Sequence, residues 1–108
     1  MNDLCDLPAH ELVRLMSSGT VSCREVMAAH LARIDDVNPL LNALIERADP
    51  QQCLDLADDA DSRVARGEPL GAAHGLPVAI KDVIKVAGLA CSGGSPVLRA
   101  VAHDDGRW

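Results

Sequence analysis

Residues 75–82 read Gly75-Leu76-Pro77-Val78-Ala79-Ile80-Lys81-Asp82, and this octapeptide decides the fold. The run Val78–Ile80 is apolar at every position, which is typical of a strand covered on both faces. Lys81 and Asp82 mark the point where that strand leaves the interior. In open α/β sheets the carboxyl end of a strand is where ligands bind. The octapeptide therefore predicts an α/β fold with a lysine at the functional edge of a sheet.

The next segment is small and rich in turn formers. It reads Gly88-Leu89-Ala90-Cys91-Ser92-Gly93-Gly94-Ser95-Pro96. Other groups can approach such a backbone closely, because glycine carries no side chain. We interpret residues 88–96 as a loop that follows the lysine-bearing strand.

Two amphipathic helices are predicted at the start of the chain. Residues 8–18 carry apolar side chains at helical spacing, and Gly19 is placed to end that helix. Ser22 and Glu25 form a capping-box pattern, in which each side chain satisfies a free backbone N–H at a helix start. The second helix is predicted to stop at Asn38-Pro39, since the residue before a proline disfavours helical backbone.

One further helix and two strands complete the predicted order. The second half of the apolar run Leu40–Ile45 is predicted to be a strand. Asp49-Pro50 supplies a capping carboxylate and a first-turn proline for a third helix, which Gly67 ends. A loop over residues 68–74 then leads to the strand Pro77–Lys81. These elements predict an α/β arrangement with an incomplete sheet, since two strands do not make a stable parallel sheet.

Length and composition limit what these 108 residues can be. They allow one domain at most, and they contain no Phe or Tyr and a single Trp, at position 108. Any core must be built from Leu, Val, Ile, Ala and Met, without the large contact area that aromatic side chains supply. A large enzyme does not fit in this length, so we expect an incomplete chain.

Charge and hydropathy exclude several classes of partner. The net charge is −6, and no aromatic residues are interleaved with the ten basic ones, so we expect no nucleic-acid binding. The sequence has no apolar run long enough to span a membrane, and its acidic N-terminus differs from the basic start of a secretory signal. We therefore expect a cytoplasmic protein that binds no membrane.

The titratable residues show no metal-binding pattern. The four cysteines lie singly at positions 5, 23, 53 and 91, and the four histidines form no HxxxH or HxxH pair. Since zinc sites use closely spaced ligands, we expect reduced thiols, no metal and no cofactor. Four acidic residues spread around the third predicted helix, where we expect a solvated face rather than acid–base catalysis. They are Asp55, Asp58, Asp59 and Asp61.

From Pro8 onward the chain resembles the N-terminal part of amidase signature enzymes. The resemblance rests on the order and spacing of Ser22-x-x-Glu25-Val26, Asn38-Pro39 with Leu41–Ile45, Gly71 with His74–Asp82, Val86–Gly88, and Gly94–Leu98. The block around the octapeptide is its most specific part. The resemblance covers nearly the whole chain and implies the N-terminal helices and first strands of this family's mixed sheet.

The resemblance implies hydrolysis or transfer at an amide carbonyl by a serine nucleophile, a second serine held by a cis peptide, and a lysine base. Lys81 matches that lysine. A lysine buried beside an apolar strand has its ammonium form disfavoured, so it can accept a proton near neutral pH. Judged from the pattern alone, a Lys-Asp pair at a strand end is instead a solvated terminus. We expect Lys81 to descend from the catalytic base and Asp82 to fix local hydrogen bonds.

In this family the two catalytic serines lie in a later glycine- and serine-rich stretch, beyond the position that corresponds to Trp108. Ser92 and Ser95 lie only 11 and 14 residues after Lys81, in the counterpart of a family loop that carries neither catalytic serine. A compact dyad of Lys81 with Ser92 or Ser95 stays an alternative, because a glycine-rich turn can fold back on the strand end. We expect residues 1–108 to be the N-terminal fragment of an amidase domain, inactive alone, whose parent acts on a small-molecule amide.

Two further questions stay open at this point. The parent can be a stand-alone amidase or the amidase subunit of a tRNA-dependent amidotransferase, and nothing in these residues separates the two. Alternatively, the chain is a non-catalytic α/β module that binds a partner, or a second copy of itself, through exposed sheet edges. A cooperative unfolding transition would favour the module.

Overall fold

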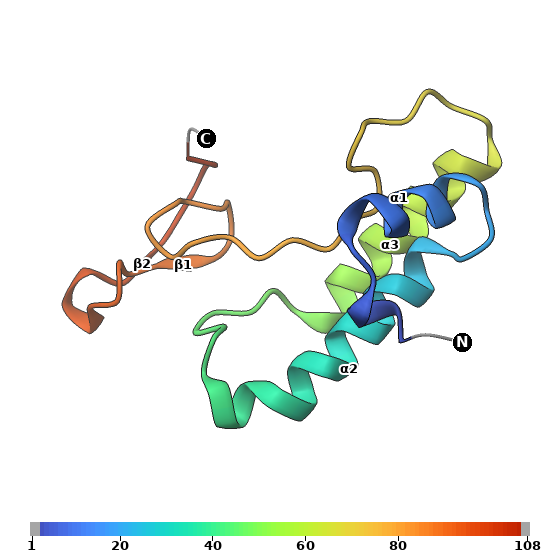
Figure 1. The fold of residues 1–108 in the computed structure, drawn as a ribbon. Helices are drawn as coiled ribbons and strands as arrows, with labels where there is room; N and C mark the ends of the chain where they lie inside the picture. Colours follow the sequence, from blue (N-terminus) through green and yellow to red (C-terminus); the bar gives the residue numbers. More distant parts are fainter. Residues whose placement is uncertain (1–2, 107–108) are drawn as a thin grey trace. The chain divides into compact units, whose positions relative to one another are not determined.

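The structure of this chain is a computed structural model that describes residues 3–106. Over this range it contains three α-helices followed by a two-stranded antiparallel sheet (Figure 1). The elements are a 3₁₀ helix Leu4–Asp6, α1 Ala9–Ser17, α2 Cys23–Leu41, α3 Pro50–Ala65, β1 Ala90–Cys91, a 3₁₀ helix Pro96–Leu98 and β2 Ala100–Val101. The predicted α/β class is confirmed.

The chain divides into two compact units. The first, here called the helical unit, comprises the residues up to Leu41 together with Asp49–Pro77. The second, here called the lysine unit, comprises Asn42–Ala48 and the residues from Val78 onward. The boundary therefore falls inside the octapeptide, between Pro77 and Val78.

The two helices predicted first are confirmed as α1 and the start of α2. Gly19 follows α1 with φ +76°, a left-handed conformation that glycine adopts without a steric cost. At the start of α2 the Ser22 hydroxyl accepts the Glu25 N–H at 2.9 Å. The same hydroxyl donates to the Glu25 carboxylate at 3.2 Å, so the two side chains bond to each other. The Ser22 half of the capping box is thus present as predicted.

The predicted stop of the second helix at Asn38-Pro39 is wrong. Helix α2 continues to Leu41 with Pro39 inside it. Pro39 lies in the last turn, where its missing N–H removes a single bond from a long helix. The left-handed residue that follows the helix is Asn42, with φ +50°, and asparagine is the residue that most often replaces glycine there.

The third predicted helix is confirmed as α3. The Asp49 carboxylate accepts the Gln51 N–H at 3.3 Å, and Pro50 occupies the first turn. Gly67, with φ +68°, follows the helix end. Residues 68–74 form the predicted loop, without helix or strand.

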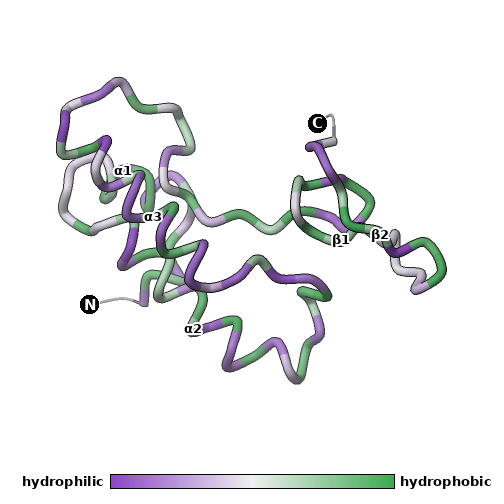
Figure 2. Tube along the Cα trace, turned by 180° about the vertical axis from the view of Figure 1, so that it is seen from behind, coloured by the Kyte–Doolittle hydropathy of each residue, from purple (hydrophilic) through white to green (hydrophobic). Residues whose placement is uncertain are grey.

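The core lies in the helical unit. Its buried residues come from all three helices and the link between α1 and α2, and they are Leu12, Met16, Val21, Cys23, Val26 and Ala57. The cluster is aliphatic and sulfur-containing, as the composition requires. Burying a side chain such as Met16 or Val26 contributes roughly 1.5–3 kcal/mol. Figure 2 shows apolar and polar residues interleaved along α2 and α3, the pattern of helices with one buried side.

Both predicted strands are wrong. Residues 42–45 and 77–81 belong to no strand, and Val78 is 70% exposed rather than covered on both faces. The strands instead fall in and just after the segment interpreted as a loop, where Ala90 pairs with Val101 and Cys91 with Ala100. A strand needs a partner for its backbone groups, and within residues 3–106 nothing pairs with residues 77–81.

The lysine unit has no buried core of its own within the described residues. All the buried apolar residues belong to the helical unit. Several large apolar side chains of the lysine unit are exposed, among them Ile45, Val78, Val83, Val97, Leu98 and Val101. Over residues 3–106, no helix is both long and apolar enough to cross a membrane.

Candidate active-site segment

The start of the octapeptide is anchored in the helical unit. The His74 ring Nε2 lies 2.9 Å from the Ala60 carbonyl oxygen of α3. Gly75 has φ +78°, and a Cβ placed on it would lie 2.5 Å from the Cys23 sulfur. Leu76 packs against the buried cluster. Glycine is therefore required at position 75, because both the backbone conformation and the neighbouring thiol exclude a side chain.

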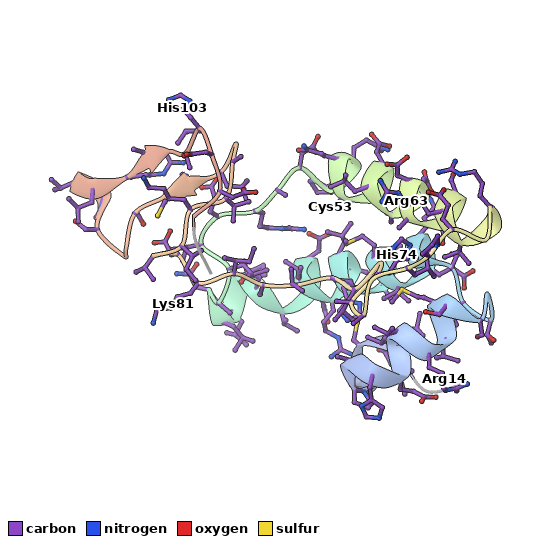
Figure 3. The ribbon with its side chains drawn as sticks, turned by 90° about the horizontal axis from the view of Figure 1, so that it is seen from above. Arg14, Cys53, Arg63, His74, Lys81 and His103 are labelled. Carbon is purple, nitrogen blue, oxygen red and sulfur yellow. The ribbon has the colours of Figure 1, made fainter. Side chains whose placement is uncertain are left out.

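Lys81 follows an extended segment and begins a turn. The Lys81 carbonyl oxygen accepts the Ile84 N–H at 2.9 Å. Its side chain is exposed and points away from the neighbouring side chains (Figure 3). Within residues 3–106, its ammonium group makes no hydrogen bond or ion pair. The chain therefore presents Lys81 without a partner of its own.

Asp82 holds the glycine-rich segment in place. Its Oδ1 accepts the Ser92 N–H at 3.0 Å. Its Oδ2 accepts the Ser92 hydroxyl at 2.5 Å and the Gly94 N–H at 2.9 Å. The expectation that Asp82 fixes local hydrogen bonds is confirmed. These bonds, with the Ser92 hydroxyl first among them, hold the pKa of the Asp82 carboxyl below its ordinary value.

The backbone of the glycine pair has a special conformation. Gly93 and Gly94 have φ values of +59° and +86°, a left-handed region that residues with side chains rarely adopt. A second link ties this segment to Asp82, because the Cys91 thiol donates to the Asp82 carbonyl oxygen at 2.8 Å. Residues 91–94 are thus held to residue 82 through both its main chain and its side chain.

The structure does not form the compact dyad. The Ser92 hydroxyl donates to Asp82. In the part of the chain that the structure describes, no hydrogen bond joins Lys81 to Ser92 or Ser95. The two residues that the fold brings together are therefore Asp82 and Ser92. In the sequence, the only indication of this pair is that the two residues lie close together along the chain.

The acidic residues of α3 have structural partners. The Asp58 carboxylate pairs with Arg24 at 2.6 Å, and Asp55 accepts a hydrogen bond from Gln51 at 3.0 Å. Asp61 accepts the N–H groups of Cys23 and Arg24, at 2.6 and 3.1 Å, and so caps the start of α2. The exposed side chains of Asp55, Asp58 and Asp59 agree with a solvated face. The cap by Asp61 was missed because it joins residues 37 and 38 positions apart.

The cysteine thiols are free, and the lysine unit holds a cavity that Lys81 does not line. All four cysteines are free, and burial raises the pKa of the Cys23 thiol to about 11. Over residues 3–106, no group of three His, Cys, Asp or Glu side chains could hold a metal ion. The lysine unit has an open cavity of about 290 Å³ lined by residues that include Lys85, Cys91 and His103. Lys81 is not among its lining residues.

Comparison with known proteins gives one family. A family model described as Amidase matches residues 25–107, a range that contains α3, the whole octapeptide and the glycine pair. The match covers well over half of the chain. It therefore includes every residue of the segment described above.

The two curated relatives compared below are subunits of one kind of enzyme. The A-subunit of glutamyl-tRNA(Gln) amidotransferase from Salinispora tropica is 44% identical over 98 residues, which is 91% of this chain and 20% of the relative. The protein of the same name from Alkalilimnicola ehrlichii is 43% identical over 88 residues, which is 82% of this chain and 18% of the relative. The chain thus spans about a fifth of the length of these relatives.

A solved structure has the same fold. It is described with the words "An unexpected vestigial protein complex reveals the evolutionary origins of an s-triazine catabolic enzyme". Its TM-score is 0.84 at 32% identity, and the match covers 92% of this chain and 22% of that chain. Sequence and structure therefore agree on the same part of a longer fold.

Proposed function

Because this chain belongs to the amidase family, we propose that it is the lysine-bearing part of an enzyme acting on carbon–nitrogen amide bonds. The observation that carries the proposal is the family match over residues 25–107, which contains the complete octapeptide. The substrate is a small-molecule amide, and the site of action is the cytoplasm.

Lys81 is the general base of the proposed reaction. A serine oxygen attacks the amide carbonyl carbon, and its proton passes through a second serine to the neutral amine of Lys81. The tetrahedral intermediate then collapses, the C–N bond breaks, and the leaving nitrogen takes up the proton. Backbone N–H groups stabilise the oxyanion. Both serines and the oxyanion site come from protein beyond residues 3–106, in which Lys81 has no serine partner.

For Lys81 to act as a base, further protein must cover its side chain. A lysine becomes a base near neutral pH when burial disfavours its ammonium form, whereas Lys81 is exposed here. We therefore expect the purified 108-residue chain to release no ammonia or amine from simple aryl and alkyl amides. Turnover that disappears in Lys81→Ala and in either Ser92→Ala or Ser95→Ala would instead establish the compact dyad and contradict this proposal.

The base role is tested in a hybrid protein. Residues 1–108 replace the matching segment of the Salinispora tropica relative, and ammonia release from amides including glutamine is measured. Lys81→Ala is expected to lower kcat by about 10²–10⁴-fold, the usual contribution of a general base. Lys85→Ala is the matched control, because it is the only other lysine and is also exposed. Equal activity of the two variants would refute the role of Lys81.

The parent class favoured within the family is the amidotransferase subunit. The supporting observation is that the two curated relatives named above, at 43–44% identity, are both the A-subunit of glutamyl-tRNA(Gln) amidotransferase. A stand-alone amidase is the competing class. The result expected for the amidotransferase class is that the hybrid assembles with the amidotransferase partner subunits as well as the unchanged relative does. A hybrid that acts on amides but no longer binds those subunits would favour the stand-alone class.

A further inference from the structure

The starting observation is the way in which the residue after Lys81 is held. The Asp82 carboxylate accepts three hydrogen bonds from Ser92 and Gly94, and its carbonyl oxygen accepts the Cys91 thiol. Lys81 is itself held through its carbonyl oxygen, which accepts the Ile84 N–H. The backbone is thus fixed at Lys81 itself and on its C-terminal side, while the Lys81 side chain bonds to nothing in residues 3–106.

We propose that Asp82 is a positioning residue for Lys81. By holding residue 82 against the Gly93-Gly94 turn, it directs the Lys81 side chain away from that turn. The Lys81 side chain is exposed and points away from the neighbouring side chains (Figure 3). Asp82, by contrast, is half-buried and bonds to Ser92 and Gly94. The hydroxyl partner of Lys81 is then expected to approach on its exposed side, where the glycine pair makes no bond to it. This inference rests on the proposed function of Lys81 as a base.

A carboxylate is the side chain that this position requires. The three groups facing it, two backbone N–H groups and one hydroxyl, all donate. A carboxylate only accepts, whereas an asparagine amide would turn an NH₂ donor toward at least one of these donors. Hydrogen bonds to an ionised acceptor are also the stronger kind. An asparagine at position 82 therefore does not reproduce the hydrogen bonds by which the Asp82 carboxylate holds the turn.

The same contacts assign a role to Ser92. Its hydroxyl hydrogen is used by the Asp82 carboxylate, so Ser92 supports the turn. Removing that hydroxyl leaves the two backbone bonds to Asp82 in place. Ser92→Ala should therefore loosen the turn less than Asp82→Asn does.

The first test uses the 108-residue chain itself. Backbone and lysine side-chain NMR signals are compared in the wild type, in Asp82→Asn and in Asp104→Asn. Asp104 is the matched control, since it is an exposed carboxylate of the lysine unit without a hydrogen bond in residues 3–106. In Asp82→Asn we expect the Ser92 and Gly94 amides to exchange about tenfold faster. The Lys81 side-chain signals should shift, and those of Lys85 should not.

The second test uses the hybrid protein. If Asp82 positions Lys81, Asp82→Asn lowers kcat by roughly 100-fold with KM changed less than about twofold, because a misplaced base affects the chemical step. Ser92→Ala lowers kcat less, and Asp82→Glu, which keeps the carboxylate, recovers part of the loss. A general loss of folding would change the helical circular dichroism signal, which serves as the control for every variant.

Three outcomes separate the proposals. If Lys81→Ala abolishes activity while Asp82→Asn keeps its kcat and the Lys81 signals stay unshifted, the positioning role is overturned and the base role stands. If Lys81→Ala is itself fully active, the proposed function fails, and with it the inference about Asp82. If Ser92→Ala is as inactive as Lys81→Ala, Ser92 is a nucleophile and the positioning role is overturned.

Discussion

At the residue scale, Gly75 is the position where the family motif is most tightly constrained by its neighbours. Its φ of +78° and the Cys23 sulfur, 2.5 Å from the place of a Cβ, both act against substitution. Gly75→Ala should lower the free energy of unfolding by about 2–4 kcal/mol, combining left-handed strain with overpacking. Urea denaturation followed by circular dichroism measures the change.

Gly67 supplies the matched control for this prediction. It has a similar φ of +68°, yet no atom lies within 4 Å of the place that a Cβ would occupy. Gly67→Ala should lower the free energy of unfolding by about 1–2 kcal/mol, the cost of the left-handed backbone strain alone. An equal loss at both positions would show that the contact with Cys23 contributes nothing.

Cys23 is the second residue whose surroundings decide its chemistry. Burial, followed by the Asp61 carboxylate, raises the pKa of its thiol from 9.0 to about 11. In native protein at a pH of about 8 the other cysteines, which are only half-buried, should react with a thiol reagent well before Cys23. Mass spectrometry of partially alkylated chain gives the order, and early labelling of Cys23 would contradict it.

The same shift predicts the dependence of stability on pH. The folded chain binds the Cys23 proton more tightly than the unfolded chain does. The contribution of this proton to the free energy of unfolding is therefore fully present below pH 9. It is lost as the pH rises from 9 towards 11. Cys23→Ala should remove this alkaline loss, which denaturation at about pH 8 and about pH 10.5 would detect.

At the element scale, the start of α2 depends on a side chain from α3. Asp61 accepts the N–H groups of Cys23 and Arg24, which belong to the free donors of the first turn. Asp61→Ala should lower the free energy of unfolding by about 1–2 kcal/mol, the usual cost of a lost helix cap. Thermal denaturation measures this cost.

Asp59 is the control on the same helix. It is exposed, and its carboxylate makes no hydrogen bond or ion pair within residues 3–106. Asp59→Ala should change the stability by less than about 0.5 kcal/mol. Similar losses at positions 59 and 61 would mean that the removed charge, rather than the cap, was responsible.

At the scale of the whole molecule, the two units differ in what holds them together. Among residues 3–106 the buried ones all lie in the helical unit, while the lysine unit relies on a sheet of two residues per strand. An isolated two-stranded hairpin is at best marginally stable in water. In the isolated chain, the amides of α1–α3 should therefore be strongly protected from hydrogen exchange, and those of residues 78–106 should be protected far more weakly.

This prediction also separates the two classes of function. A fragment that completes an active site with further protein is expected to have a weakly protected lysine unit until further protein covers it. A non-catalytic module is expected to unfold in one cooperative transition with both units protected alike. Hydrogen exchange followed by mass spectrometry distinguishes the two patterns, and uniform protection would favour the module.

Several features of this protein were determined by the sequence alone. The three helices and the starts of α2 and α3 were predictable, because Ser22, Asp49 and Pro50 act on backbone groups within the next few residues. The octapeptide likewise indicated both the family and the candidate base, since its residues are consecutive. Each of these signals is local.

The tertiary structure decided the remaining features. Residues 77–81 have the composition of a strand, yet they form none, because a strand exists only where another backbone pairs with it. The cap from Asp61 and the requirement for glycine at position 75 arise from contacts between distant parts of the chain. The environment of Lys81 is decided in the same way, since exposure or burial of its ammonium group depends on which protein covers it.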